Sequence, residues 1–360
     1  QSVYFQPPLW GAVSALITKI MMFLGQTAEN GFDYVRFISL FAVSGSWIIF
    51  LRLCEKLHFS EKVCLLLFST FALLPINGIM ANLVNNDAAV YFLMLGMVYA
   101  AVCWSEDFSW KNALSLSLLL LLAPMIKFSG LMVVPALAVL WLFKLLTVQK
   151  KMYARFFWQA FAVCLCAVTG FFWGWFLLYH HLPLTPPPIN NEFQNMSDFS
   201  LADRLFSVKY WLVLFADIRA GQLEPNVWLA LIKTFLFGEW AWSGNLWGYI
   251  LYLWGAFLAF CFILSFCFLG KYKCGRDYTL NAFFVVLVFS VLGAWINFWL
   301  DYPYFCSTEF RYVIILMPAA FLWSGCFLEQ KKLPKTGYAA LAVSTIIMVV
   351  ARFMLYLNTI

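Results

Sequence analysis

The chain has 360 residues, of which 64% are apolar and only 11% carry a charge. Soluble globular domains have about twice that proportion of charged residues, so the composition excludes a soluble protein. The net charge of +6 comes from positive clusters between apolar stretches, and it indicates contact with anionic lipid head groups and not with nucleic acid. The sequence therefore predicts an integral membrane protein.

Residues 1–35 open the chain with a segment that we do not expect to cross the membrane. Its apolar stretch, Leu9 to Gly25, would reach only about 25 Å as a helix, and it contains Lys19. Apolar side chains recur at helical spacing after Pro7-Pro8, which is typical of a helix lying in the membrane interface. We expect a further membrane span upstream of Gln1, since no signal peptide is visible in this segment.

The rest of the chain predicts an all-α bundle of transmembrane helices, because backbone groups in lipid must hydrogen-bond internally. Ten apolar stretches have about the length that a hydrocarbon core near 30 Å requires. They are 36–53, 62–81, 87–104, 112–126, 130–147, 155–179, 247–269, 281–299, 311–328 and 337–357. The predicted organisation is a first loop with a surface helix (1–35), spans (36–179), a large loop (180–246) and further spans (247–360).

Charged residues orient these spans. More than half of the 23 Lys and Arg fall in short connections on one side of the threaded chain. These are Arg52/Lys56/Lys62, Lys111, Lys144/Lys150/Lys151/Arg155, Lys271/Lys273/Arg276 and Lys331/Lys332/Lys335. By the positive-inside rule that side is cytoplasmic. Residues 1–35 and 180–246 are then expected on the outer face, where aromatic residues such as Phe206, Trp228 and Phe235 predict short interfacial helices.

Short polar segments also fall on the predicted outer side. They are Gln6-Pro7-Pro8-Leu9, Asn85-Asn86-Asp87, Lys127-Phe128-Ser129-Gly130, the run Lys233–Glu239 and Glu309-Phe310-Arg311-Tyr312. Asp87 opens a span, where its carboxylate can cap the helix or face a polar cleft beside the amides of Asn85 and Asn86. Arg311 can bind phosphate in a bidentate manner or simply snorkel from a span end. Lys127 is a second cation on the side that has few, and Glu239 is an acid beside aromatic residues.

In their order along the chain these segments resemble the GT-C superfamily of integral-membrane glycosyltransferases. The similar branch contains the protein O-mannosyltransferases and the lipid A aminoarabinose transferases. The segments are Gln6–Leu9, the surface helix, Tyr34-Val35-Arg36-Phe37, Asn85–Asp87, Lys127–Gly130, Lys233–Glu239 and Arg311-Tyr312. Two features depart from the family. Gln6 stands where the family has a histidine, and the family's acidic catalytic motif would lie upstream of Gln1, so we expect the chain as given to be inactive without it.

The resemblance implies transfer of a sugar from a polyprenyl-phosphate donor to a lipid, glycan or protein acceptor. It places the enzyme in a bacterial cytoplasmic membrane with its active site on the outer face. The implied roles are catalytic for Asp87 and Glu239, donor-phosphate binding for Lys127, Arg311 and Tyr312, and substrate contact for Gln6, Asn85 and Asn86. The resemblance leaves open whether a divalent metal ion takes part.

Two other classes of function compete with this interpretation. A lipid-linked polysaccharide ligase or polymerase shares the substrates and the membrane side, but it requires a different order of motifs. A transporter or flippase typically places charged residues and helix breaks near the bilayer midplane and shows repeat symmetry. The predicted spans are nearly free of charge, and the single large loop breaks any symmetry between the halves, which favours the transferase.

Overall fold

The computed structural model describes residues 7, 9–181, 195–209, 211, 224–238, 245–268, 271 and 278–358, without the side chains of 177–181. In these ranges the protein is all-α, as the composition predicts. Seven described helices are long and apolar enough to cross a membrane, and two bent helix pairs raise the number to nine. The one predicted span outside these nine is 112–126, which corresponds to α7 (Trp110–Ile126), a shorter helix of 17 residues. The protein is therefore an integral membrane protein, while a span at 112–126 stays a prediction.

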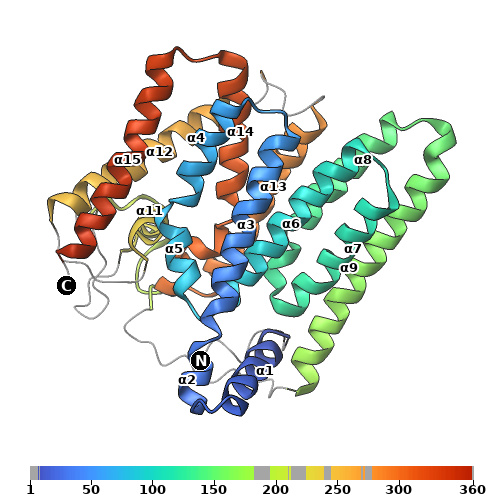
Figure 1. The fold of residues 1–360 in the computed structure, drawn as a ribbon, viewed down its shortest axis with the longest axis horizontal. Helices are drawn as coiled ribbons and strands as arrows, with labels where there is room; N and C mark the ends of the chain where they lie inside the picture. The colour runs from blue at the N-terminus through green and yellow to red at the C-terminus, as the bar shows by residue number, and fades with distance from the viewer. Residues whose placement is uncertain are drawn as a thin grey trace. The chain divides into compact units, whose positions relative to one another are not determined.

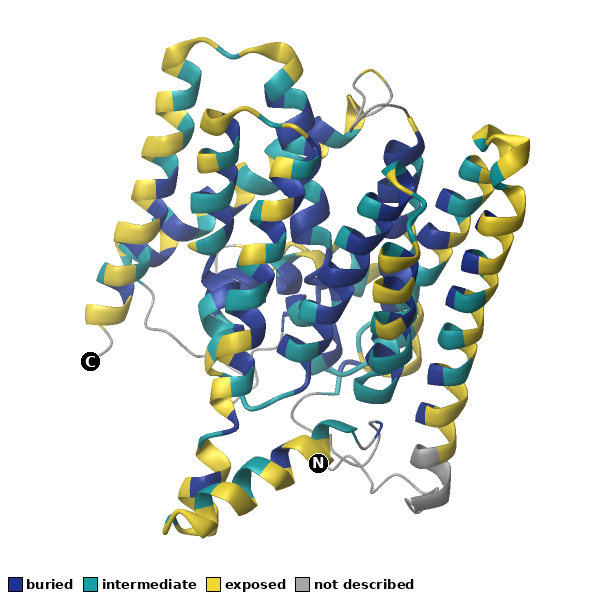
Figure 2. Ribbon diagram, turned by 45° about the vertical axis from the view of Figure 1, so that its right-hand side comes forward, coloured by how far each residue is buried: buried dark blue, intermediate teal, exposed yellow. Residues whose placement is uncertain are grey.

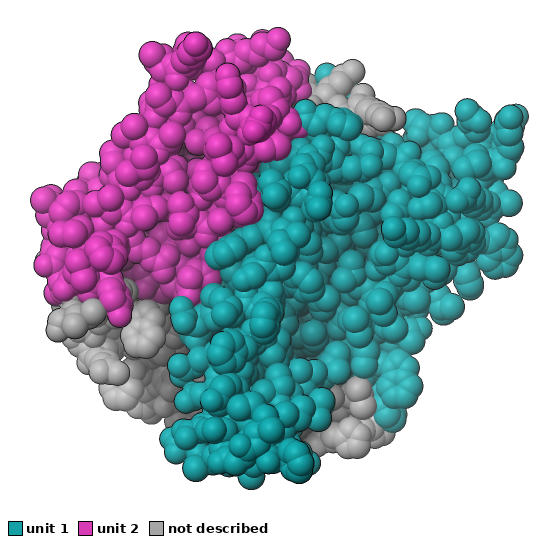
Figure 3. All heavy atoms as spheres, in the orientation of Figure 1, with its two compact units in different colours: residues 1–58, 80–189, 273–291 teal, residues 59–79, 190–272, 292–360 magenta. Residues whose placement is uncertain are grey.

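The chain divides into two compact units, each assembled from segments that are far apart in sequence (Figure 3). Unit 1 contains residues 1–58, 80–189 and 273–291, and unit 2 contains residues 59–79, 190–272 and 292–360. Helix α13 (Thr279–Asp301) contributes residues to both units.

Unit 1 is built around α6 (Asp87–Glu106), whose apolar window is 78% buried. This helix packs against α3 (Arg36–Lys56) and α7, and α7 packs in turn against α9 (Tyr153–His181) (Figure 1). The segments η2 (Phe128–Val133), α8 (Val134–Thr147) and η3 (Lys150–Met152) lead from α7 to α9. An apolar helix surrounded by other helices needs no polar face, so α6 is buried on nearly all sides.

Helix α9 approaches α7 closely at two glycines one turn apart. A Cβ atom at Gly170 would lie 2.6 Å from the carbonyl oxygen of Leu121, and one at Gly174 would lie 2.7 Å from that of Pro124. Small residues at this spacing let helix backbones approach each other in membranes. The opposite face of α9 is exposed (Figure 2) and carries large apolar side chains such as Phe161 and Phe172, as expected for contact with lipid.

The first helices of unit 1 are α1 (Leu9–Phe23) and α2 (Ala28–Asp33). Helix α1 occupies the stretch in which a surface helix is predicted, and with 15 residues it is not among the helices long enough to span. It contacts α2 and α7 at one end of the unit (Figure 1), and it exposes Leu16, Ile20 and Phe23. These exposed apolar residues are available for contact with lipid, and the interfacial position of α1 stays a prediction.

Unit 2 contains two bent segments. Helices α4 (Glu61–Ala72) and α5 (Pro75–Asn82) meet at 49°, where the sequence predicts one unbroken span. The short turns η6 (Phe305–Thr308) and η7 (Phe310–Val313) meet α14 (Leu316–Lys331) at 44°. Pro75 cannot donate the backbone hydrogen bond that would continue α4, so the helix ends before it. The side chain of Asn77 donates to the carbonyl of Phe71 (2.6 Å) and so satisfies a group near the break.

The remaining helices of unit 2 are α10 (Leu201–Phe206), α11 (Val227–Phe237), α12 (Leu246–Cys267) and α15 (Lys335–Leu357). Helix α12 packs against α14 and α15, and α4 contacts the same two helices. Helices α10 and α11 lie where the large loop predicts short helices. Most of α11 is buried against α12 and η7, however, so its apolar residues form protein core where interfacial contact is predicted.

Candidate functional site

Helix α6 carries an ion pair at each end. Asp87, its first residue, pairs with Lys127, and Glu106, its last residue, lies 2.7 Å from the Nζ atom of Lys56. A helix of this length separates the two pairs by about 30 Å, the thickness of a hydrocarbon core. Asp87 and Lys127 therefore meet at the end of α6 opposite the basic cluster that contains Lys56.

The local structure of both segments brings Asp87 and Lys127 together. The Asn85 side chain accepts from the backbone N–H of Asp87 (3.1 Å), and the Asn86 side chain donates to the carbonyl of Ile126 (3.0 Å). Lys127 leaves α7 in an extended conformation. Gly130 then lets the following turn fold back onto α7, because a Cβ atom there would lie 2.7 Å from that of Ala123. The Asn86 amide thus ties the start of α6 to the end of α7, and Asn85 stabilises the first residue of α6.

The Asp87–Lys127 pair is largely withdrawn from solvent, with 7% and 13% of the two side chains exposed. Asn86 is the N-cap of α6 and makes no side-chain cap hydrogen bond, and the Asp87 carboxylate is directed to Lys127. The sequence leaves two roles open for Asp87, a helix cap or a carboxylate facing a polar cleft, and the polar cleft stays a prediction. The carboxylate holds a cation at the start of a span.

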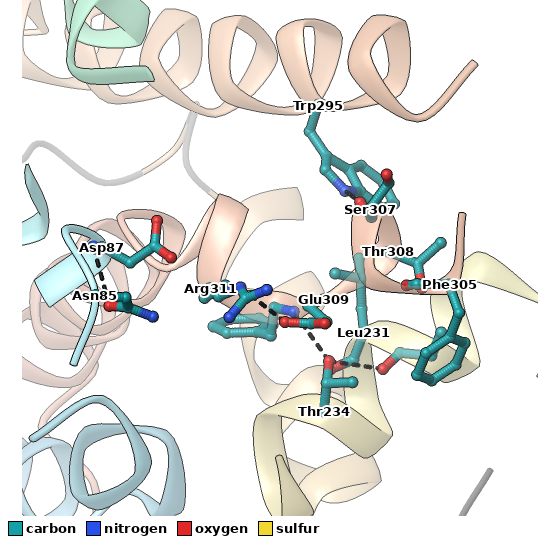
Figure 4. Close-up of polar contacts among 12 residues, drawn as sticks. Asn85, Asp87, Leu231, Thr234, Trp295, Phe305, Ser307, Thr308, Glu309 and Arg311 are labelled. Atoms are coloured by element: carbon teal, nitrogen blue, oxygen red, sulfur yellow. Dashed lines mark hydrogen bonds and ion pairs between the residues drawn. The ribbon is translucent and has the colours of Figure 1, made fainter. Parts of the chain in front are cut away.

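A second charged pair lies in unit 2 (Figure 4). The Nε atom of Arg311 lies 2.7 Å from Oε2 of Glu309, and the Arg311 guanidinium lies over the Tyr312 ring, 5.5 Å from its centroid. The Glu309 side chain is 5% exposed and that of Arg311 is 21% exposed. Arg311 and Tyr312 belong to η7, which precedes α14. The sequence predicts the first turn of a span at this position.

Helix α11 holds η7 in place. The Thr234 hydroxyl accepts from the backbone N–H of Phe310 (2.9 Å) and donates to the carbonyl of Ala230 (2.8 Å), and the Phe235 ring packs against the Phe310 ring. Phe310 lies between Glu309 and Arg311, so α11 fixes the backbone from which both charged side chains extend (Figure 4). Two separate polar segments of the sequence, 233–239 and 309–312, thus contribute to one site.

Sequence reasoning missed a buried ion pair beside this site. The Lys233 ammonium binds the Glu224 carboxylate, with side chains 5% and 1% exposed. Glu224 also accepts from the backbone N–H of Asn226, whose side chain caps α11. Burial lowers the pKa of Lys233 from its ordinary value, while the hydrogen bond from Lys233 to Glu224 opposes that shift. The sequence does contain a sign of this pair, because Lys233 is the one charged residue in the apolar helix α11. A buried cation of this kind requires an anionic partner.

The structure does not describe every residue that the sequence predicts for the site. Gln6 and Glu239 lie outside the described residues. Their common side in the sequence predicts that Asp87, Lys127, Glu239 and Arg311 line one cavity. Asp87 and Lys127 belong to unit 1 and Arg311 to unit 2, so this cavity stays a prediction. Within the described ranges no group of three or more His, Cys, Asp or Glu could hold a metal ion.

No known family model matches the sequence, and neither does any curated protein. The resemblance to GT-C glycosyltransferases thus depends on the motifs and on their order along the chain.

Proposed function

We propose that this protein is a GT-C-type glycosyltransferase that moves a sugar from a polyprenyl-phosphate donor to an acceptor on the non-cytoplasmic face. One observation carries the proposal. Each of the two cations expected to bind the donor phosphate, Lys127 and Arg311, is held by a buried carboxylate next to the start of an apolar helix. Buried charges are costly, and functional sites are where such arrangements concentrate.

The chemistry requires fixed positive charge. When the bond between sugar and phosphate breaks, negative charge grows on the phosphate oxygens, and preorganised cations stabilise that charge. Asp87 and Glu309 hold Lys127 and Arg311 in defined directions before the substrate binds. The planar guanidinium of Arg311 suits bidentate phosphate binding, with Tyr312 supporting it from one side.

The acceptor must also lose a proton, which requires a carboxylate base. In this proposal the base is a carboxylate of the acidic catalytic motif that the resemblance implies. Asp87 then acts on Lys127 rather than on the acceptor, and Glu239 is the second acid near the sugar. The acceptor is a lipid, a glycan or a protein.

Replacing either cation tests the proposal. Arg311→Ala and Lys127→Ala should each lower transfer about a hundredfold or more, because loss of one preorganised electrostatic group removes about 2–4 kcal/mol of transition-state stabilisation. The assay is transfer from a synthetic lipid-phosphate sugar by the full-length protein in detergent. Arg155→Ala, an exposed cation on α9, is the matched control and should leave transfer unchanged.

Thermal unfolding must show that each variant is folded. Undiminished transfer by folded Arg311→Ala and Lys127→Ala proteins would refute the proposed roles. The product separates the competing classes, since a ligase or polymerase joins a whole glycan to its acceptor and a flippase forms no new glycosidic bond.

A further inference from the structure

Arg352 is a cation within a membrane span. It lies about 25 Å along α15 from the first residue, Lys335, and shortly before the last, Leu357. Helix α15 is among the seven long apolar helices, and the residues around Arg352 are apolar in sequence. Charged side chains at such positions are rare, costly and usually paired, so each one calls for an explanation.

A glycine provides the space in which the Arg352 side chain lies. A Cβ atom at Gly78 on α5 would lie 2.8 Å from Nη2 and 3.3 Å from Nη1 of Arg352. Any side chain larger than that of glycine would therefore displace the guanidinium. Helix α4, which precedes α5 in the same bent segment, is also joined to α15, by a hydrogen bond of 2.8 Å between Thr70 and Thr345. The position of Arg352 against Gly78 thus belongs to a packed contact between two segments of unit 2.

The protein supplies no counter-charge to this arginine within the described residues. No ion pair or side-chain hydrogen bond there involves Arg352. The neighbours of Gly78 on α5, Asn77 and Ile79, are uncharged, and the Asn77 amide donates to the carbonyl of Phe71. A half-buried guanidinium that has no anionic partner among the described residues is stabilised when an anion from outside the protein reaches it.

We propose that Arg352, seated against Gly78, binds the phosphate group of a membrane lipid. At this depth the anions available to a span are lipid head groups, and a guanidinium binds phosphate through two parallel hydrogen bonds. The site lies near the end of α15 remote from the basic residues Lys331, Lys332 and Lys335, so the threaded chain places it in the outer leaflet. An arginine that only snorkelled into water would not need a glycine beneath it. This site does not depend on the proposed transferase activity.

Two lipids distinguish the possible sources of the phosphate. The purified full-length protein in detergent is titrated with dioleoyl phosphatidylglycerol or with farnesyl phosphate, and the midpoint of thermal unfolding is followed. At least one lipid should raise the midpoint of the wild type in a saturable manner, and dioleoylglycerol, which has no phosphate, should not. A response to phosphatidylglycerol alone assigns a structural phospholipid, and one to farnesyl phosphate alone assigns a polyprenyl carrier.

Three variants locate the effect. Arg352→Gln should raise the half-saturating lipid concentration at least about tenfold, as expected for loss of a charge-assisted contact. Gly78→Ala should do the same by displacing the guanidinium, and Arg352→Lys should lose less. Arg155→Gln is the matched control in unit 1 and should titrate like the wild type.

The proposal is overturned if neither lipid shifts the wild type, if dioleoylglycerol shifts it equally, or if Arg352→Gln and Gly78→Ala titrate unchanged. Should Arg352→Gln not fold, Gly78→Ala and Arg352→Lys decide the matter, because both keep the positive charge.

Discussion

At the scale of single residues, the Asp87–Lys127 pair raises the question of how two buried charges are stabilised. Two charges with side chains 7% and 13% exposed lose much of their hydration, and their attraction offsets that loss only while both are present. The sequence identifies each residue as a candidate, from a span start and from a lysine on the side that has few. It does not identify them as partners, because their contact depends on how α6 packs against α7.

A double-mutant cycle measures the coupling between these two residues. Asp87→Ala should lower the free energy of unfolding by about 3 kcal/mol, since it leaves Lys127 buried without its anion. The double variant with Lys127→Ala should be more stable than the sum of the two single changes predicts, with a coupling of at least about 1 kcal/mol. Unfolding in mixed micelles gives these values.

The exposed pair Arg52–Glu55 is the control, because its side chains are 62% and 49% exposed. Solvent screening should leave the same cycle on this pair without measurable coupling. Equal coupling in the two pairs would contradict the structural argument for Asp87 and Lys127.

At the scale of elements, the lengths of apolar runs predict helices well and their breaks poorly. Helices occupy all ten predicted ranges. The bend before Pro75 was missed, because apolar residues continue through it. Residues 311–313 form part of the short turn η7, where the sequence predicts the first turn of a span. The burial of α11 was also missed, since an apolar face looks the same in sequence whether it meets lipid or protein.

Thr234 should position η7 through its hydroxyl. Thr234→Val keeps the shape of the side chain but leaves the Phe310 N–H buried and unpaired, so we expect a loss of about 1–3 kcal/mol in stability and reduced transfer. Thr234→Ser should restore both. If Thr234 positions Arg311, the transfer activity of Thr234→Val should fall by a larger factor than the fraction of folded protein does. Transfer that is unchanged in folded Thr234→Val would remove this role.

The contact between α7 and α9 should tolerate no methyl group at Gly174. Gly174→Ala places a Cβ atom 2.7 Å from the carbonyl oxygen of Pro124, so the helices must separate and the midpoint of thermal unfolding should fall. Gly293→Ala in α13 is the matched control, because no atom lies within 4 Å of its added Cβ. There the higher helix propensity of alanine should raise stability by up to about 1 kcal/mol. Equal shifts in both variants would contradict the proposed packing.

At the scale of the whole molecule, the class of fold followed from composition, whereas the direction of the spans is a prediction from charge alone. The threaded chain predicts opposite sides for Glu29 in α2 and Lys150 in η3, both of which are exposed. Single cysteines at these positions should therefore label differently with a membrane-impermeant maleimide in intact cells. Permeabilised cells, in which both should label, are the control. Labelling of both positions in intact cells would require a different threading.

The candidate site could be predicted only in part. The polar segments and their residue types were visible in sequence, whereas the partners of Lys127, Lys233 and Arg311 were not. Asp87 was a candidate from its position at a span start and Glu309 lay in a polar segment, but the cation that each one binds is set by packing and by the exclusion of water. Glu224 gave no signal of its own in the sequence.

The ion pairs at the two ends of α6 give this helix a fixed hydrophobic length. Other spans can adapt to a thicker or thinner bilayer by tilting, but α6 is anchored at Asp87 and at Glu106, and it is enclosed by its neighbours. Lipids around unit 1 must then stretch or compress to match about 30 Å of apolar helix. Bilayers of different acyl-chain length should consequently alter the stability of this protein, with an optimum near the thickness that α6 sets.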